Sequence, residues 1–209
     1  MGIFLGKLDQ NKQQKRESLL NAAFNLFTTK GISKTSISDI ALTAGVAKGT
    51  FYLYFKDKHD IRNKLISHKS SQVFKNSVVA LENYLSKKTE ISIDNKIIFV
   101  IDNIINQLSE NKPLLSFISK NLSWGIFKTA LISPENGYDI NFKDVYLEII
   151  NNSEVKLKDP EIMLFMIIEL VGSSCYSTIL YSQPTTIEQL KPYLYSAIKN
   201  IINSHKTGN

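Results

Sequence analysis

The placement of proline most strongly constrains how this chain folds. All five prolines lie at or beyond Pro113, and before that point apolar residues recur mostly at helical spacing, with few of the alternating runs typical of strands. We therefore predict an all-helical (all-α) chain. Its 209 residues suffice for one domain with a sizeable core or for two small ones.

The first 60 residues predict three helices. The first runs from about Lys12 to Thr29, with its apolar face at Leu20, Ala23, Phe24 and Phe27, and it ends at Gly31, a natural left-handed cap. The second begins at Ser36, whose hydroxyl caps the first turn, with Asp39 completing a capping box.

The second helix stops after about two turns at Gly45, and a third starts at residue 47 and continues through Phe55. Two short helices joined by a tight glycine turn form a helix-turn-helix. Val46, Ile40 and Phe55 are interpreted as core residues that hold these helices at a fixed angle.

Six further helical stretches are predicted, separated by breaks near Pro113, Pro134, Pro160 and Pro184. They cover about residues 58–86, 93–108, 114–131, 142–151, 160–182 and 186–204. Pro192 falls inside the last of them, in its first two turns or at a kink. The expected domains are therefore a three-helix helix-turn-helix domain over residues 1–58 and a C-terminal helical bundle over residues 59–209.

Composition argues against an enzyme and against a bound metal or cofactor. Cys175 is the only cysteine, and the three histidines lie far apart without metal-ligand spacing. A reducing, cytoplasmic location fits this cysteine usage. The most apolar stretch, from Ile162 to Tyr181, has Glu169 at its middle, which favours a buried helix over a membrane span.

Positive charge is concentrated in the predicted helix-turn-helix region. Residues 1–60 hold nine Lys or Arg against five Asp or Glu, whereas the remaining residues hold sixteen against fourteen. A basic surface alone is weak evidence, but a helix-turn-helix is an element that enters the major groove. The coincidence predicts DNA binding.

The same region resembles a known family. The run from Gly31 to Ala41 (GISKTSISDIA) and the run from Ala44 to Lys58 (AGVAKGTFYLYFKDK) are similar to the DNA-binding domain of the tetracycline-repressor (TetR) family of transcription regulators. The resemblance covers about residues 12–60. For the rest of the chain it implies only an architecture, a helical bundle that dimerises and often encloses a small-molecule pocket.

The matching positions suggest how DNA would be bound. Lys48, Gly49 and Thr50 open the recognition helix, where Thr50 can meet a base edge or a thymine methyl and Lys48 a guanine or a phosphate. Phosphate contacts are expected from the hydroxyl of Ser36, from the ammonium of Lys58 and, by resemblance, from Tyr52 and Tyr54. Packing aromatics are the alternative reading of the two tyrosines.

In the C-terminal bundle the family resemblance implies a ligand pocket, and residues that share helical faces are candidates for its lining. The expected lining is Phe117, Asn121, Trp124, Phe127, Glu169 and Tyr176, which would suit an apolar, aromatic or cationic small molecule. Ordinary core packing is the alternative for these aromatics, and a structural hydrogen bond is the alternative for Glu169. The last two helices are expected to form a homodimer through a stripe of small residues, namely Ile167, Val171, Ser174 and Thr178.

Together these patterns predict a homodimeric DNA-binding transcriptional regulator, a repressor released from a palindromic double-stranded DNA operator by a small effector. One alternative is a constitutive helix-turn-helix module that binds DNA or another protein without an inducer. A second is an enzyme with an appended helix-turn-helix, against which the scarcity of catalytic residue types argues.

Overall fold

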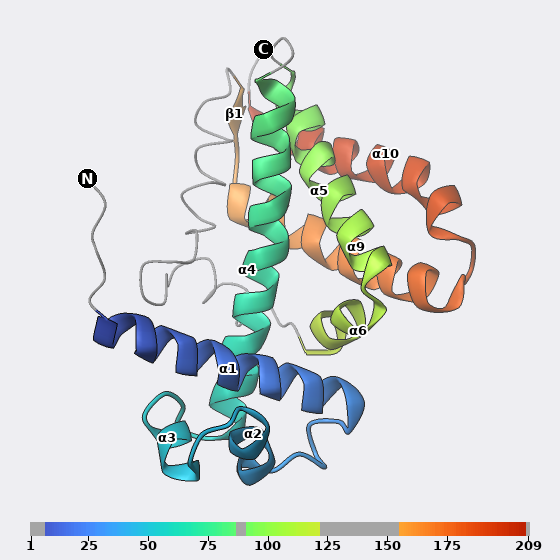
Figure 1. The fold of residues 1–209 in the computed structure, drawn as a ribbon. Helices are drawn as coiled ribbons and strands as arrows, with labels where there is room; N and C mark the ends of the chain where they lie inside the picture. The colour runs from blue at the N-terminus through green and yellow to red at the C-terminus, as the bar shows by residue number, and fades with distance from the viewer. Residues whose placement is uncertain (1–6, 87–90, 122–154, 208–209) are drawn as a thin grey trace. The chain divides into compact units, whose positions relative to one another are not determined.

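The computed structural model describes residues 7–86, 91–121 and 155–207, and within these ranges the fold is helical apart from one pair of two-residue strands (Figure 1). The chain forms two compact units, Met1–Ser67 and His68–Asn209. The boundary between them falls inside helix α4 (Lys58–Leu85). The all-α prediction is confirmed.

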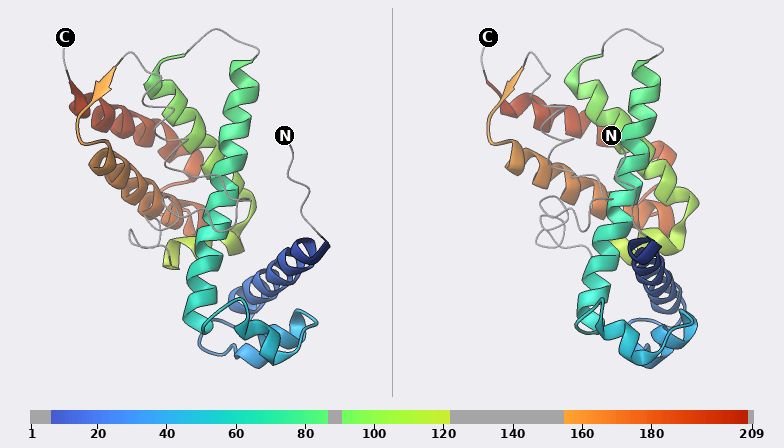
Figure 2. Two further views of the ribbon diagram at one scale, coloured as in Figure 1. Left: turned by 90° about the vertical axis from the view of Figure 1, so that its left-hand side faces the viewer. Right: turned by 60° about the vertical axis from the view of Figure 1, so that its left-hand side comes forward.

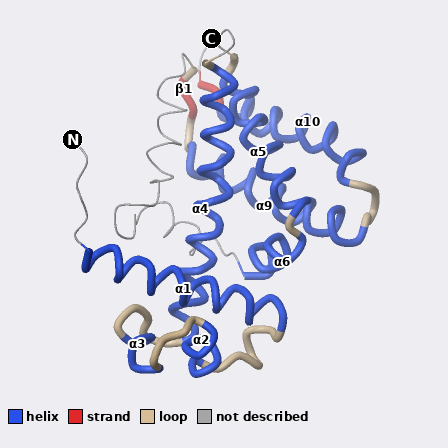
Figure 3. The backbone as a smooth tube through the Cα atoms, in the orientation of Figure 1, coloured by secondary structure: helices blue, strands red, loops and turns tan. Residues whose placement is uncertain are grey.

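The first unit contains α1 (Lys7–Thr29), α2 (Ile37–Thr43), α3 (Lys48–Tyr52) and the start of α4. α1 begins five residues earlier than predicted, because its first polar residues contain no proline or glycine and extend the helix past the apolar pattern. α3 ends three residues earlier than predicted, and Leu53 forms its C-cap (Figure 3).

The turns of this unit follow the sequence prediction. Ser36 caps α2 with its hydroxyl, and Asp39 completes the capping box by accepting from the Ser36 backbone. Gly31 and Gly45 have φ angles of +86° and +69°, a left-handed conformation that glycine adopts without the steric cost of a Cβ. These glycines set the short connections on either side of α2.

The core of the first unit is formed by apolar residues from all four helices. Phe51 and Phe55 are 0% and 1% exposed, and their ring centroids lie 5.6 Å apart. The ammonium of Lys64 lies 5.6 Å from the centroid of the Phe55 ring, a cation–π contact within the unit. The other fully enclosed side chains include Leu19, Leu20, Ala23, Ile40, Ile61, Leu65 and Ile66.

The second unit contains the rest of α4 with α5 (Ile93–Glu110), α6 (Lys112–Asn121), β1 (Lys156–Leu157), α9 (Pro160–Tyr181), α10 (Ile187–His205) and β2 (Lys206–Thr207). Helices α9 and α10 lie side by side (Figures 1 and 2). Their bounds match the predicted stretches within one residue, with Pro160 in the first turn of α9 and Pro192 in the second turn of α10. The helix predicted over residues 142–151 lies outside the described residues.

The antiparallel pairing of β1 with β2 was not predicted, since each strand has only two residues and neither shows an alternating pattern. Lys206 pairs with Leu157 in this ladder, and its ammonium donates to Asp94 at 2.8 Å. This ion pair ties the residue that follows α10 to the first turn of α5.

Helix α9 supplies much of the core of the second unit, and it also has the length and composition of a membrane-spanning helix. Ile167 and Thr178 are 3% and 2% exposed, and Val171 packs against the same core. The small-residue stripe that we expected at a dimer interface therefore faces largely inward. The apolar side chains that α9 leaves exposed are Ile162, Phe165 and Met166, together with Tyr181 at its end.

A polar cluster joins α5 to α10. Asp102 accepts a short hydrogen bond from the Tyr195 hydroxyl and lies 3.1 Å from the Lys191 ammonium. Burial works against ionisation of Asp102, but the hydrogen bonds from Tyr195 and Lys191 outweigh it and hold its pKa below the ordinary value. Burial and the hydrogen bond to Asp102 raise the pKa of Tyr195.

The lowered pKa of Asp102 predicts a pH-dependent contribution to stability. A depressed carboxyl pKa stabilises the fold above the unfolded-state pKa of about 4, and this stabilisation is lost as the pH falls through the folded-state value. Asp102→Asn should lower the free energy of unfolding at pH 7, because it removes the charge that Lys191 and Tyr195 stabilise. The loss should be only about 1 kcal/mol, because the Asp102 side chain is 40% exposed and solvent screens the interaction. Below pH 3 the difference from wild type should vanish.

Chemical denaturation at several pH values measures this difference. Glu188→Gln is the matched control, because Glu188 contacts the same Lys191 at 3.7 Å with 76% of its side chain exposed. An Asp102→Asn difference that stays constant from pH 7 to pH 3 would contradict the assignment.

Candidate functional site

The orientation of α3 is fixed by its buried phenylalanine. Successive residues of a helix turn by about 100°, so Phe51, which is 0% exposed, directs the opposite side of α3 to solvent. Lys48 and Gly49 are exposed on the outer surface, Tyr52 is 53% exposed, and Thr50 is partly buried. The residues predicted to read DNA thus lie together on one short helix.

The two tyrosines combine packing with exposure. The Tyr52 ring meets Phe51 edge to face, with centroids 5.4 Å apart, and the half-buried Tyr54 ring lies 6.4 Å from Phe55. Each ring therefore braces the phenylalanine core. The exposure of Tyr52 leaves it accessible from solvent.

Lys58 has a different part from the one predicted. Its ammonium donates to the carbonyls of Ile32 and Thr35 at 2.9 and 3.0 Å, with Ser33 as a third acceptor at 3.4 Å. These bonds use its three donors and tie the connection between α1 and α2 to the start of α4. Lys58 therefore has a structural role within this unit, and its phosphate contact stays a prediction.

Ser36 is likewise engaged within the fold. Its hydroxyl donates to the Asp39 carboxylate at 2.8 Å and accepts from the Asp39 backbone at 3.1 Å. Hydrogen bonds from the backbone and then from the hydroxyl of Ser36 hold the pKa of Asp39 below its ordinary value. A phosphate contact from Ser36 would require this hydroxyl to leave Asp39.

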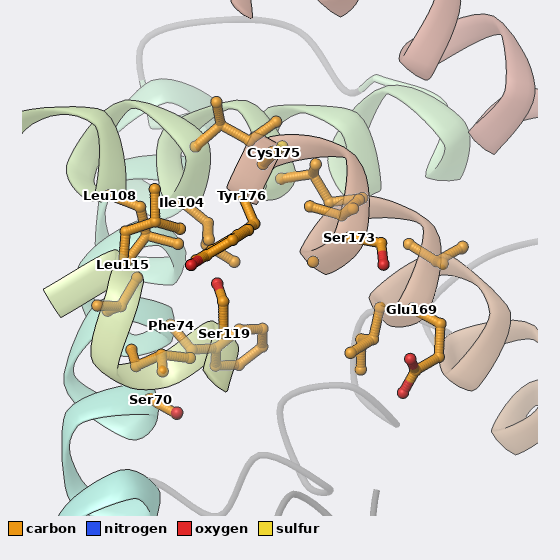
Figure 4. A pocket seen from close by; sticks show the side chains of 18 of the residues that line it. Ser70, Phe74, Ile104, Leu108, Leu115, Ser119, Glu169, Ser173, Cys175 and Tyr176 are labelled. Carbon is orange, nitrogen blue, oxygen red and sulfur yellow. The ribbon is translucent and has the colours of Figure 1, made fainter. Parts of the chain in front are cut away.

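The second unit encloses a cavity of about 490 Å³ lined by α4, α5, α6 and α9 (Figure 4). Most of the described lining residues are aliphatic, and two of the described ones, Phe74 and Tyr176, are aromatic. The aliphatic wall comprises Val73, Ile97, Val100, Ile101, Ile104, Ile105, Leu108, Leu115, Ile118, Leu164, Ile167, Ile168 and Val171. Its size and apolar walls are those of a small-molecule site.

The predicted lining is only partly right. Glu169 and Tyr176 line the cavity, whereas Phe117 is buried without being part of its wall. Helix α6 turns Leu115, Ile118 and Ser119 toward the cavity, so Phe117 falls on another face. The side chain of Asn121 lies outside the described residues, as do Trp124 and Phe127.

Polar groups gather where α6 meets α9, and the sequence analysis missed two of them. The hydroxyls of Ser119 and Tyr176 point toward one another in Figure 4, and Lys120 also lines the cavity. A hydrogen bond with Tyr181 and the nearby Lys120 ammonium lower the pKa of Tyr176. Lys120 lies in the last turn of α6, and this position was the only feature of the sequence that could have indicated its role at the cavity.

Behind one cavity wall, a hydrogen-bond network joins α4 to α5. Gln107 donates to the Val73 carbonyl at 3.0 Å, to Ser77 at 2.8 Å and to Asn103 at 2.9 Å. Ser77, which is 0% exposed, also donates to the Val73 carbonyl at 2.9 Å. The network fixes the register of α4 against α5 beside a residue that lines the cavity.

The chemistry of the cavity is that of binding. Burial raises the pKa of the Cys175 thiol to about 12, which opposes formation of a reactive thiolate. Among the described residues, no group of three or more His, Cys, Asp or Glu side chains could hold a metal ion.

Comparison with known proteins agrees with this geometry. Residues 19–65 match the family model described as "Bacterial regulatory proteins, tetR family", which includes α2, α3 and both phenylalanines of the core. Residues 19–65 of this chain thus form a tetR-family domain. This family consists of regulatory proteins, which agrees with the sequence-based prediction that the protein is not an enzyme.

One curated relative matches a short stretch of this chain. The regulator AcrR of Shigella flexneri is 41% identical over 59 residues, which are 28% of this chain and 27% of AcrR. The chain thus matches about a quarter of that relative's length.

Two solved structures share the fold over nearly the whole chain. A TetR-family transcriptional regulator of Haemophilus influenzae has a TM-score of 0.58 at 21% identity, covering 95% of this chain and 100% of that one. The FadR regulator of Bacillus subtilis, in complex with stearoyl-CoA, has a TM-score of 0.60 at 19% identity, covering 87% of this chain and 96% of that one.

The part played by Lys58 in this tetR-family domain can be tested by Lys58→Met. Losing a charged donor to three carbonyls should lower the free energy of unfolding by about 1–3 kcal/mol. Urea denaturation measures the loss, and Lys56→Met, at an exposed position two residues away, is the control. Unchanged stability together with a weaker salt dependence of DNA binding would restore the phosphate role.

Proposed function

We propose that this chain is a homodimeric DNA-binding transcriptional regulator, acting in the cytoplasm as a repressor that a small molecule releases from a palindromic operator. The observation that carries the proposal is the outer surface of α3, where Lys48 and Gly49 lie exposed above the buried Phe51. A short, rigidly anchored helix with a basic residue at its start has the form that enters a major groove.

The dimer would form through the exposed apolar face of α9. Ile162 is 54% exposed and Met166 is 37% exposed, one turn apart on the same side of the helix. Tyr193, on the neighbouring α10, is 77% exposed. Apolar side chains exposed on adjacent helices are typical of an interface between identical subunits, and two subunits would present two recognition helices to successive major grooves.

The effector would be a molecule with an aliphatic body and an anionic head. The wall of the cavity is aliphatic, which favours an alkyl chain over the aromatic or cationic ligand expected from the sequence. Lys120, Ser119 and Tyr176 offer donor groups where α6 meets α9. Glu169 is a single carboxylate about two turns earlier in α9, apart from Ser119 and Tyr176 (Figure 4). The stearoyl-CoA bound by the FadR structure is a ligand of this kind.

Release requires the effector to prefer one conformation of the dimer. A preference of roughly 3 kcal/mol for the state with wrongly spaced recognition helices would weaken DNA binding by about two decades. Helix α4 belongs to both units and carries Val73 and Phe74 at the cavity, so a shift of its register is the expected link.

DNA binding is tested by the salt dependence of fluorescence anisotropy on duplexes enriched from a randomised pool. Lys48→Ala should weaken binding and reduce the slope of log affinity against log salt by about one for each phosphate contact that is lost. Lys199→Ala, at an exposed position of α10, should leave the slope unchanged. Failure of the wild-type protein to retain any duplex would refute the proposal.

The effector class is tested by adding decanoyl-CoA, decanoate or decylamine to the protein–duplex complex. The anionic compounds should release the duplex, and Lys120→Ala should weaken them about tenfold, a loss typical of one charge-assisted contact. Glu169→Gln serves as the control and should leave the anionic compounds unaffected.

Stronger release by decylamine, abolished in Glu169→Gln, would support the cationic ligand instead. If none of these alkyl compounds changes the affinity for DNA, the constitutive helix-turn-helix module becomes the better description.

A further inference from the structure

The recognition helix ends at a strongly exposed residue, Leu53, that the sequence analysis did not single out. Leu53 is 80% exposed, although leucine is usually buried. It forms the C-cap of α3 with φ −73° and ψ −20°, so its backbone continues the helical conformation. Its position around the helix axis can therefore be compared with those of the helical residues.

The two faces of α3 follow from its helical repeat. Positions four apart share a face, so Leu53 lies one turn after Gly49, and both lie nearly opposite the buried Phe51. Gly49 has no side chain, and Leu53 is thus the bulkiest group at the centre of the outward face. Thr50 and Tyr52 lie to either side of it, whereas Lys48, exposed at the start of the helix, lies about 140° around the axis from Leu53.

The glycine is not required by the fold. A Cβ built at Gly49 meets no atom within 4 Å, and its φ is not in the left-handed range, unlike those of Gly31 and Gly45. The unit could therefore accommodate a side chain at this position. Neither the missing side chain at Gly49 nor the exposed Leu53 contributes to the packing of the unit. We therefore expect the shape of this face to serve contact with a bound partner.

We infer that Leu53 is a specificity-determining residue that contacts the C5 methyl group of thymine in the major groove; this inference rests on the proposed function. The methyl group is the apolar feature that a base pair presents in this groove, and apolar side chains pair with it. The gap at Gly49 allows the close approach that this contact needs. Lys48, exposed at the start of the same helix, supplies a positive charge for the DNA backbone.

The test replaces thymine by uracil, which lacks the methyl group. Duplexes are first enriched from a randomised pool by the wild-type protein, and each thymine of the recovered sequence is then replaced in turn. At the contacted position the wild-type affinity should fall about fourfold per half-site, the effect of one methyl group losing its apolar contact. Leu53→Ala should bind the thymine and uracil duplexes equally.

Leu42→Ala is the matched control, because Leu42 is 81% exposed on α2, so the same substitution removes the same surface. It should keep the thymine preference. Thermal unfolding should be unchanged in both variants, since neither side chain is buried.

Three results would overturn the inference: a wild type indifferent to uracil at every position, a Leu53→Ala variant that still discriminates, or a Leu42→Ala variant that loses discrimination as well. If Leu53→Ala binds every duplex as the wild type does, Leu53 does not contact DNA, and a contact with a protein partner becomes the better explanation of its exposure. If no duplex is enriched at all, the proposed function itself fails, and this inference with it.

Discussion

The burial of Phe51 and Phe55 is the constraint on which the rest of the first unit depends. A recognition helix of five residues is too short to be stable alone, so its position comes from the phenylalanines that it places in the core. Their burial turns Gly49 and Leu53 outward and braces the rings of Tyr52 and Tyr54. The Lys58 ammonium then ties the start of α4 to the connection before α2 by donating to the carbonyls of that connection.

Local features of this fold could be predicted from the sequence, and distant contacts could not. The capping box of Ser36 and the left-handed Gly31 and Gly45 depend on residues within a few positions, where turn and cap preferences apply. The acceptors of Lys58 lie more than twenty positions away, and nothing in a one-dimensional pattern indicates them. A lysine at a helix start was therefore assigned to DNA when its ammonium bonds to the backbone.

The cavity shows the same limit in the second unit. Aromatic spacing on α6 suggested Phe117, but the wall is made of aliphatic side chains from four helices, and which face of each helix turns inward depends on its neighbours. The stripe of Ile167 and Thr178 was predicted to contact a second subunit, but Ile167 belongs to the chain's own core and Thr178 is 2% exposed. The network of Gln107 and Ser77 behind that wall gives α4 a defined register that a ligand could bias.

Hydroxyl-radical footprinting of the protein, read by mass spectrometry with and without an enriched duplex, tests most directly whether the outward face of α3 is the DNA surface. Leu53 and Tyr52, exposed by 80% and 53%, should lose most of their reactivity when the duplex binds, whereas Tyr193 on α10, exposed by 77%, should keep its own. Full reactivity of Leu53 in a complex that retains the duplex would contradict the account.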